Sequence, residues 1–385
     1  MRKTYVIHMI RGVLLLPLLI SCGTNTPVTF PDSVTFRREK ATHILLSNGR
    51  LLDLDPPLSI NRMKIFDTLL IATGKSAGNE YGVHLYSKNS GKLVASCALM
   101  GRGPNENLNI FNFQLIRESR QLFFFDIMAR RAQLYSIDKV LAENNAAPEE
   151  TILFGKSIFD PLLRIGENEY ICKNSLIKPA PDDRVMLSKV SLPDFTTITR
   201  CFFPDYWALP ENIWYSQLSS IFHSNYSLSG TGEFIVLSYY RTDMLEVYDK
   251  NLFLKTRVQG PDQFFPAFGF ASPYTSSGKT GSAQSRIEGP SSPMDNVLWP
   301  EGVARFGYEL CYAAKNGFYA SYNGAFRGGG ARTFAENIYL FQYDGKPVSR
   351  YTFDIGGFGV FTVDENENSI YLIDKLGEIR VYNLK

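Results

Sequence analysis

Short apolar segments recur at regular spacing along most of the chain, and this recurrence constrains its fold more than any other feature. The segments are rich in Phe, Tyr, Ile, Leu and Val, and clusters of Gly, Asn, Asp, Ser or Lys separate them. Short apolar runs bounded by turn-forming residues are typical of β-strands. Few stretches carry a helical period, and we expect only a short helical turn between Lys139 and Asn145. The pattern therefore predicts an all-β protein.

The segments also pair into a repeated unit. Each unit consists of a strand, a polar turn and a second strand that ends near an aromatic residue. The clearest copies are Leu122–Phe125 with Ala132–Tyr135, Phe234–Leu237 with Leu245–Tyr248, Phe318–Ser321 with Ile338–Phe341, and Ile370–Ile373 with Ile379–Tyr382. From Asp126 to Asp374 the repeat is about 49 residues, once the apparent insertions 206–219 and 263–299 are set aside. A four-stranded propeller blade takes about 40–50 residues.

This repeat predicts a single six-bladed β-propeller with four-stranded blades over residues 41–385. The expected blades cover residues 60–103, 104–155, 156–205, 220–262, 300–354 and 355–385. The last blade would lack one strand, which the N-terminal segment His43–Leu46 or Leu51–Leu54 could supply, closing the ring. Two packed β-sandwich domains are the alternative, but no clear linker lies near the middle of the chain.

The first 21 residues have the features of a lipoprotein signal peptide. Arg2, Lys3 and Arg11 precede or border a short apolar run, and the segment ends Leu19-Ile20-Ser21-Cys22. The run is too short to span a membrane. The ending resembles a bacterial lipobox, which implies cleavage before Cys22 and attachment of diacylglycerol and a further acyl chain such as palmitate. A plain secretory signal is the alternative. Residues 22–40 would then be the lipidated cysteine and a tether.

The charge of the chain gives no reason to expect nucleic acid as a partner. The full chain carries a net charge of +2, but removing residues 1–21 leaves 37 basic against 38 acidic residues. Nucleic-acid binders instead show a basic excess. The residues after Cys22 lack the acidic run that resembles a surface-export signal, which favours the periplasmic side of an outer membrane.

The segment Gly101-Arg102-Gly103-Pro104-Asn105-Glu106 follows the first blade. Together with the lipobox and the blade pattern, it resembles the TolB-like six-bladed propeller lipoproteins of Bacteroidetes over nearly the whole mature chain. The resemblance implies no established reaction. A partial echo, Gln259 to Phe264, follows the fourth blade and contains Asp262.

The glycines and proline of this segment suit a chain crossing from an outer strand toward the ring axis. Arg102, Asn105 and Glu106 are therefore candidate ligand-binding residues at the mouth of the central channel, as is Asp262. The alternative is that Arg102 and Glu106 form a structural ion pair.

Aromatic residues give a second set of candidates. Tyr206, Trp207, Trp214 and Tyr215 cluster between the third and fourth blades, Tyr240 and Arg241 follow a strand, and Trp299 ends the long insertion. Exposed Trp and Tyr rings stack on sugars and peptides, and Arg adds hydrogen bonds. Packing between the blades is the alternative for each ring. We take Trp207, Trp214, Tyr240 and Arg241 as candidate ligand contacts.

No catalytic constellation is evident. Gly74-Lys75-Ser76-Ala77-Gly78 fits G-x-S-x-G, but a strand follows it where a nucleophile elbow needs a helix. The histidines are isolated, and Cys97, Cys172, Cys201 and Cys311 are expected to be free, so no metal site or cofactor is expected. We therefore expect a lipid-anchored module that binds a glycan, a peptide or a partner protein. The alternative is a calcium-dependent lactonase-like hydrolase, with Glu106, Asp126 and Asp262 as candidate carboxylates.

Overall fold

The computed structural model describes residues 29–384, except 76–79, 104, 111–112, 144–145, 155–161, 174–183, 193–195, 207, 212, 271–296 and 329–333. The predicted signal peptide, Cys22 and Trp207 therefore lie outside the described residues. Within the described residues, every helix is too short for a membrane crossing. The four described cysteines are free, as expected.

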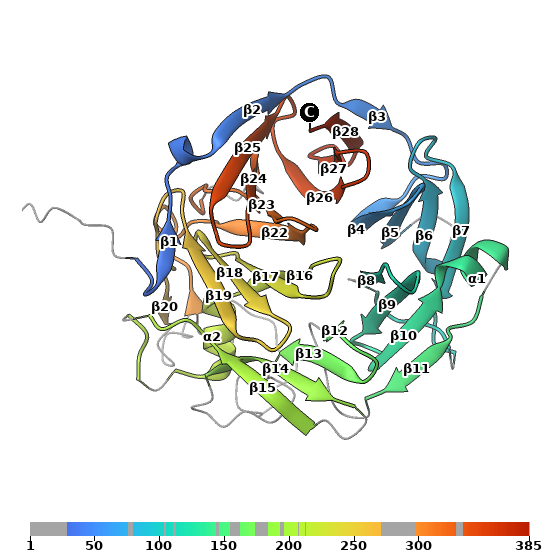
Figure 1. The fold of residues 1–385 in the computed structure, drawn as a ribbon, viewed down its shortest axis with the longest axis horizontal. Coiled ribbons are helices and arrows are strands. Elements are labelled where there is room, and N and C mark those ends of the chain that lie inside the picture. The colour runs from blue at the N-terminus through green and yellow to red at the C-terminus, as the bar shows by residue number, and fades with distance from the viewer. Residues whose placement is uncertain are drawn as a thin grey trace, which may run out of the picture.

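The sheets of the structure form a ring of six four-stranded blades, which confirms the predicted fold (Figure 1). The strands of each blade are given from the innermost to the outermost. The first blade contains β4 (Ser59–Phe66), β5 (Leu69–Lys75), β6 (Tyr81–Ser87) and β7 (Leu93–Leu99), and the second contains β8 (Phe113–Ile116), β9 (Gln121–Asp126), β10 (Arg131–Ser136) and β11 (Glu150–Leu153). The third blade contains β12 (Leu162–Arg164), β13 (Glu169–Lys173), β14 (Val185–Ser191) and β15 (Thr196–Phe202).

The fourth to sixth blades have the same order. They are β16 (Ser224–Leu228), β17 (Phe234–Tyr239), β18 (Met244–Asp249) and β19 (Leu254–Gln259); β22 (Tyr308–Ala313), β23 (Phe318–Tyr322), β24 (Asn337–Phe341) and β25 (Pro347–Phe353); and β26 (Phe358–Asp364), β27 (Ser369–Asp374), β28 (Ile379–Asn383) and β3 (Arg50–Leu52). The sixth blade thus takes its outermost strand from the N-terminal part of the chain, because β3 pairs antiparallel with β28.

The core lies between neighbouring blades, where the apolar faces of successive sheets meet. Val83 and Leu85 of the first blade belong to the same buried cluster as Leu122 and Phe124 of the second. Burying both faces of each sheet explains why the central strands read as continuous apolar runs in the sequence. The expected helical turn is α1 (Ile137–Ala142), between β10 and β11.

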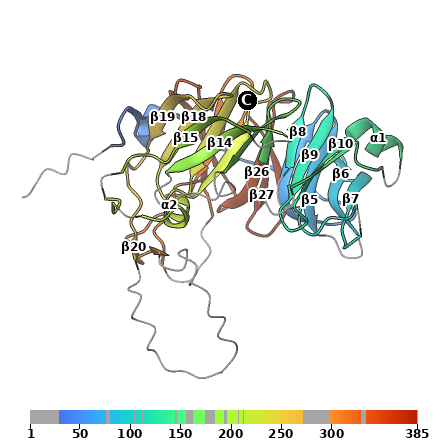
Figure 2. The same ribbon diagram turned by 90° about the horizontal axis from the view of Figure 1, so that it is seen from below.

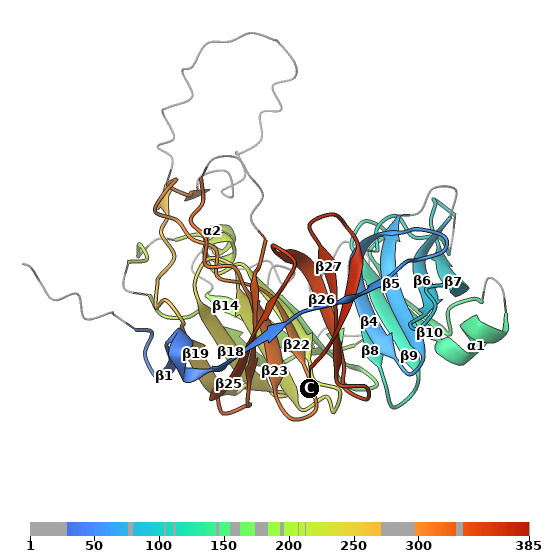
Figure 3. The ribbon, with the colours of Figure 1, turned by 90° about the horizontal axis from the view of Figure 1, so that it is seen from above.

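An N-terminal belt, residues 29–52, runs along the outer rim of three blades (Figure 3). Its strand β1 (Ser33–Thr35) pairs parallel with β19, and β2 (Thr42–Leu46) pairs parallel with β25, before β3 completes the sixth blade. A 3₁₀ turn, η1 (Arg38–Lys40), joins β1 to β2. Phe30 and Phe36 of the belt are buried. Residues 29–40, which the sequence placed in a tether, therefore pack against the ring.

The two ends of the blades carry different kinds of loop. Because adjacent strands within a blade are antiparallel, the blade-to-blade connections and the turns between second and third strands share one end, here called the connection face. The turns between first and second strands lie at the other end, the turn face. Described parts of both insertions lie on the connection face: α2 (Tyr215–Ile221), β20 (Gly269–Phe270) and β21 (Val297–Leu298) (Figure 2).

Candidate functional site

The Gly101–Glu106 segment forms a turn that is closed by its own glutamate. Glu106 accepts a hydrogen bond from the Gly103 backbone N–H at 2.6 Å. A Cβ atom at Gly101 would collide with this carboxylate, which explains the glycine. The alternative ion pair between Arg102 and Glu106 does not form in the described part of the chain, where Glu106 binds this backbone group instead. Arg102 and Asn105 are exposed on the connection face.

Asp126 is also held by backbone groups. Its carboxylate accepts N–H groups from Leu108 and Asn109 in the blade connection and from Met128 and Ala129 in its own turn. Glu106, Asp126 and Asp262 therefore each have their own donors. Among the described residues, no three His, Cys, Asp or Glu side chains are placed to share a metal ion.

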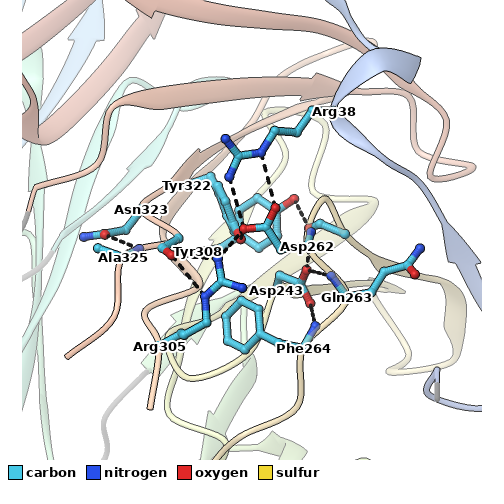
Figure 4. Close-up of polar contacts among 12 residues, drawn as sticks. Arg38, Asp243, Asp262, Gln263, Phe264, Arg305, Tyr308, Tyr322, Asn323 and Ala325 are labelled. Atoms are coloured by element: carbon cyan, nitrogen blue, oxygen red, sulfur yellow. Dashed lines mark hydrogen bonds and ion pairs between the residues drawn. The ribbon is translucent and has the colours of Figure 1, made fainter. Parts of the chain in front are cut away.

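Asp262 is the centre of a polar cluster that joins the belt to the fourth and fifth blades (Figure 4). Arg38 of η1 approaches its two carboxylate oxygens at 3.2 and 3.1 Å. Arg305 donates to it at 2.5 Å and the Tyr322 hydroxyl donates at 2.9 Å. Asp243 supports the segment from beneath, because it accepts the backbone N–H groups of residues 262–264.

The environment of Asp262 favours its charged form. Burial alone would raise the pKa of this carboxyl, but the hydrogen bonds from Arg38 and Tyr322, together with the two arginine charges, lower it below its usual value. The Arg305 guanidinium is flanked by the rings of Phe264 and Phe326, at 4.8 and 4.9 Å from their centroids. Asp262, a candidate ligand contact in the sequence, is thus held by donors within the protein.

Most of the predicted aromatic cluster packs within the protein. Tyr206 stacks on Phe265 with ring centroids 5.1 Å apart, so the first insertion contacts the second. Tyr215 is buried in the core between the third and fourth blades. Trp214, just before α2, is half exposed. Among the described residues of this cluster, Trp214 is the most exposed, and Tyr206 is partly buried.

Arg241 lies in an aromatic cage made by three rings on the connection face. Its guanidinium carbon is 4.4 Å from the ring centroid of Trp299, 5.0 Å from Tyr240 and 5.5 Å from Phe306. The rings of Tyr240 and Phe306 also contact each other at 5.3 Å. The cage combines the turn after β17 with the segment after β21, so the second insertion completes it. Sequence reasoning identified Tyr240, Arg241 and Trp299 but missed Phe306.

One nitrogen of the guanidinium in this cage lacks an acceptor among the described residues. The buried Nη1 atom of Arg241 has no hydrogen-bond partner in the part of the chain that the structure describes. Burial lowers the pKa of Arg241, and the nearby positive charge of Arg327 lowers it further. A guanidinium held against aromatic faces presents its remaining N–H groups in a fixed plane, which suits a carboxylate or another planar acceptor.

Comparisons with known proteins agree with the fold. Residues 57–366 match the family described as TolB-like 6-blade propeller-like. A solved structure of a member of the DUF4221 family from Bacteroides vulgatus is similar to this chain, with a TM-score of 0.50 and 9% sequence identity, over 92% of this chain and 96% of that one. At this identity the similarity concerns the fold alone. A search of curated proteins found no match.

Proposed function

The chain belongs to the TolB-like six-bladed propeller family, and on that premise we propose that it is a binding module of the cell envelope. The observation that carries the proposal is the cage around Arg241, in which a partly buried guanidinium is surrounded by three aromatic rings. Tryptophan, tyrosine and arginine are the side chains that contribute most often to binding energy at protein interfaces.

The chemistry of the cage suggests the kind of ligand. Trp299 and Tyr240 offer ring surface to the apolar face of a sugar or to a peptide side chain. Arg241 offers N–H donors without a partner in the described chain, and Arg327 adds a second positive charge nearby. A glycan or peptide that carries a carboxylate next to an apolar face fits both features.

The proposed location follows from the sequence before the described residues. The basic residues, the apolar run and Cys22 support cleavage and lipid attachment, which would anchor the module to a membrane. The residues after Cys22 favour the periplasmic side of the outer membrane. Phe30, where the belt begins, packs against Phe265 and Tyr206 of the insertions at the connection face. The anchor would therefore leave the ring near the proposed binding face.

The proposal can be tested by screening the mature protein on glycan and acidic-peptide arrays and measuring the affinity of each hit. We expect Arg241→Met and Trp299→Ala each to weaken binding at least tenfold, because each removes a contact worth about 1.4 kcal/mol or more. Arg200→Met is the matched control, since Arg200 is exposed on β15, away from the cage. Its affinity should equal that of the wild type.

Two outcomes would contradict the proposal: no array ligand binds, or the ligands that bind do so equally well to both cage variants. Trp214→Ala and Arg102→Ala extend the experiment to the exposed sequence candidates on the same face. If one of these changes abolishes binding while both cage variants bind as the wild type does, the protein binds a ligand but the proposed cage site is contradicted.

A further inference from the structure

A groove with a volume of about 570 Å³ lies at the outer edge of the sixth blade, facing the first. The belt leaves this part of the blade uncovered, because β3 pairs with only residues 379–381 of β28. Tyr382 and Asn383 continue β28 beyond that pairing, and both line the groove. Sites for small molecules have volumes of roughly 300–1,000 Å³, so the groove is large enough to hold one.

The link between β2 and β3 forms one wall of the groove. Asn48 in this link has a left-handed backbone with a φ of 60°, and its backbone N–H donates to the Asp354 carboxylate at 2.8 Å. A Cβ atom at Gly49 would collide with the ring of Tyr382, so the link passes directly over that ring. The wall is therefore fixed by a hydrogen bond on one side and by close packing on the other.

Three asparagines line the groove, and each comes from a different element. Asn48 belongs to the belt, Asn89 to the turn between β6 and β7, and Asn383 to the end of β28. All three are exposed, and their side-chain amides form no hydrogen bond with any residue that the structure describes. An amide both donates and accepts hydrogen bonds, as a hydroxyl group does. The lining is thus matched to a ligand that carries several hydroxyl groups.

The charged side chains of the groove balance each other. Arg50 and Glu367 are the two charged residues in its lining. Arg50 donates to the backbone carbonyl of Asn89 at 3.4 Å, and Lys88 pairs with Oε1 of Glu367 at 2.8 Å. One positive and one negative group leave no excess charge for an ionic ligand to neutralise, so the groove favours a neutral polar ligand.

A buried hydroxyl without a partner also belongs to the groove. Ser369 is 2% exposed and is among the lining residues, and its Oγ atom has no hydrogen-bond partner in the described chain. An unpaired buried hydroxyl is costly to the fold, and a ligand hydroxyl would satisfy it. Leu46 and Val381 add apolar surface to the same lining, which suits the C–H face of a sugar ring.

We propose that this groove binds a neutral sugar. The ring hydroxyls would bond to the three asparagine amides, and the C–H face would lie on Leu46 and Val381. Glu367 lies in the turn between β26 and β27, so the groove opens on the turn face, at the opposite end of the blades from Arg241. The proposal therefore goes beyond the proposed function and does not rest on the cage.

The experiment measures binding of the methyl glycosides of glucose, galactose, mannose and N-acetylglucosamine to the mature protein by calorimetry and saturation-transfer NMR. We expect at least one of the four to bind with a Kd in the millimolar range or below. Asn89→Leu and Asn383→Leu should each weaken this binding at least tenfold, because each removes an amide and narrows the groove. Asn168→Leu is the matched control, since Asn168 is exposed in the third blade, outside the groove.

Ser369→Ala separates a ligand role from a structural one. It should weaken sugar binding and leave the free energy of unfolding at least as high as in the wild type, because a buried group without a partner is removed. Full sugar affinity in this variant would contradict the role of the hydroxyl.

Arg241→Met should keep the full affinity for the glycoside, which distinguishes the groove from the cage. The proposal is overturned if none of the four glycosides binds the wild-type protein, or if the two asparagine variants bind as tightly as the wild type does.

Discussion

Asp262 and Arg241 lie on the same face of the ring, yet their surroundings give the two charges different roles. Asp262 receives donors from Arg38, Arg305 and Tyr322, which satisfy its carboxylate within the protein. Arg241 meets aromatic faces and leaves a buried N–H group without an acceptor in the described chain. A satisfied charge strengthens the fold, whereas an unsatisfied one retains its capacity for a ligand.

Glu246 on β18 provides a prediction about stability at the residue scale. Its carboxylate is fully buried and accepts hydrogen bonds from Arg257 at 2.8 Å, Tyr239 at 2.5 Å and Tyr248 at 2.9 Å. Arg257→Met should lower the free energy of unfolding by about 3–5 kcal/mol, because it leaves a buried carboxylate without its cation. Chemical denaturation followed by fluorescence measures this change.

The double variant Glu246→Gln/Arg257→Met is the matched control, since it removes both charges and keeps the two tyrosines. It should be more stable than the single variant, because no uncompensated charge remains buried. Equal instability of the two proteins would show that Arg257 matters for packing rather than for its charge.

Candidate functional residues could be identified from the sequence more easily than the residues that contact them in the structure. Tyr240 and Arg241 are adjacent in the sequence, and an aromatic next to an arginine at a strand end is a visible signal. Phe306 joins them from the connection between the fourth and fifth blades, without any local signal. The sequence also could not show that the charge of Asp262 is satisfied within the protein, because Arg38, the main partner of Asp262, lies 224 residues away.

At the scale of elements, the N-terminal belt is the least predictable part of the fold. Strands within a blade follow one another through short turns, so their apolar pattern and their turn residues predict these strands from the sequence. Strands β1 and β2 instead lie parallel to β19 and β25, whose sequences are more than 200 residues away, and no turn signal marks such a pairing. The sequence placed β1 in a tether for this reason.

The Asp262 cluster should hold the belt in place. In Asp262→Asn the charge that holds Arg38 and Arg305 is lost, so we expect the belt to detach more often from the ring. Limited trypsin digestion should then cleave after Arg37, Arg38 or Lys40 severalfold faster than in the wild type. Asp205→Asn is the control, because Asp205 is almost fully exposed. Unchanged cleavage in Asp262→Asn would mean that the strand pairing alone holds the belt.

At the scale of the whole molecule, six similar blades share one ring, while the proposed ligand site at Arg241 breaks the repeat. The Arg241 cage depends on Trp299 of the second insertion, which lies between the fourth and fifth blades. The repeat could be predicted from sequence because each blade obeys the same strand and turn rules. The sites could not be located as fully, because they arise where single blades depart from those rules.

The proposed anchor gives a prediction for the whole protein. Cys22→Ser should move the protein from the membrane fraction to the soluble periplasmic fraction and abolish labelling by palmitate, because the lipid would lose its attachment atom. Cys311→Ser, which changes a free cysteine within the fifth blade, should leave both properties unchanged. A Cys22→Ser protein that stays in the membrane fraction would argue against lipid attachment at this cysteine.

The belt also sets a limit on when the protein can finish folding. Synthesis produces β1, β2 and β3 before any blade, but their pairing partners are β19, β25 and β28, and β28 is the last strand of the described chain. The strands that are synthesised first therefore cannot pair until the strands synthesised last are present. The ring cannot be completed on the ribosome while its last blade is still being made. A chain with this order of pairing therefore keeps an open ring until β28 has been synthesised.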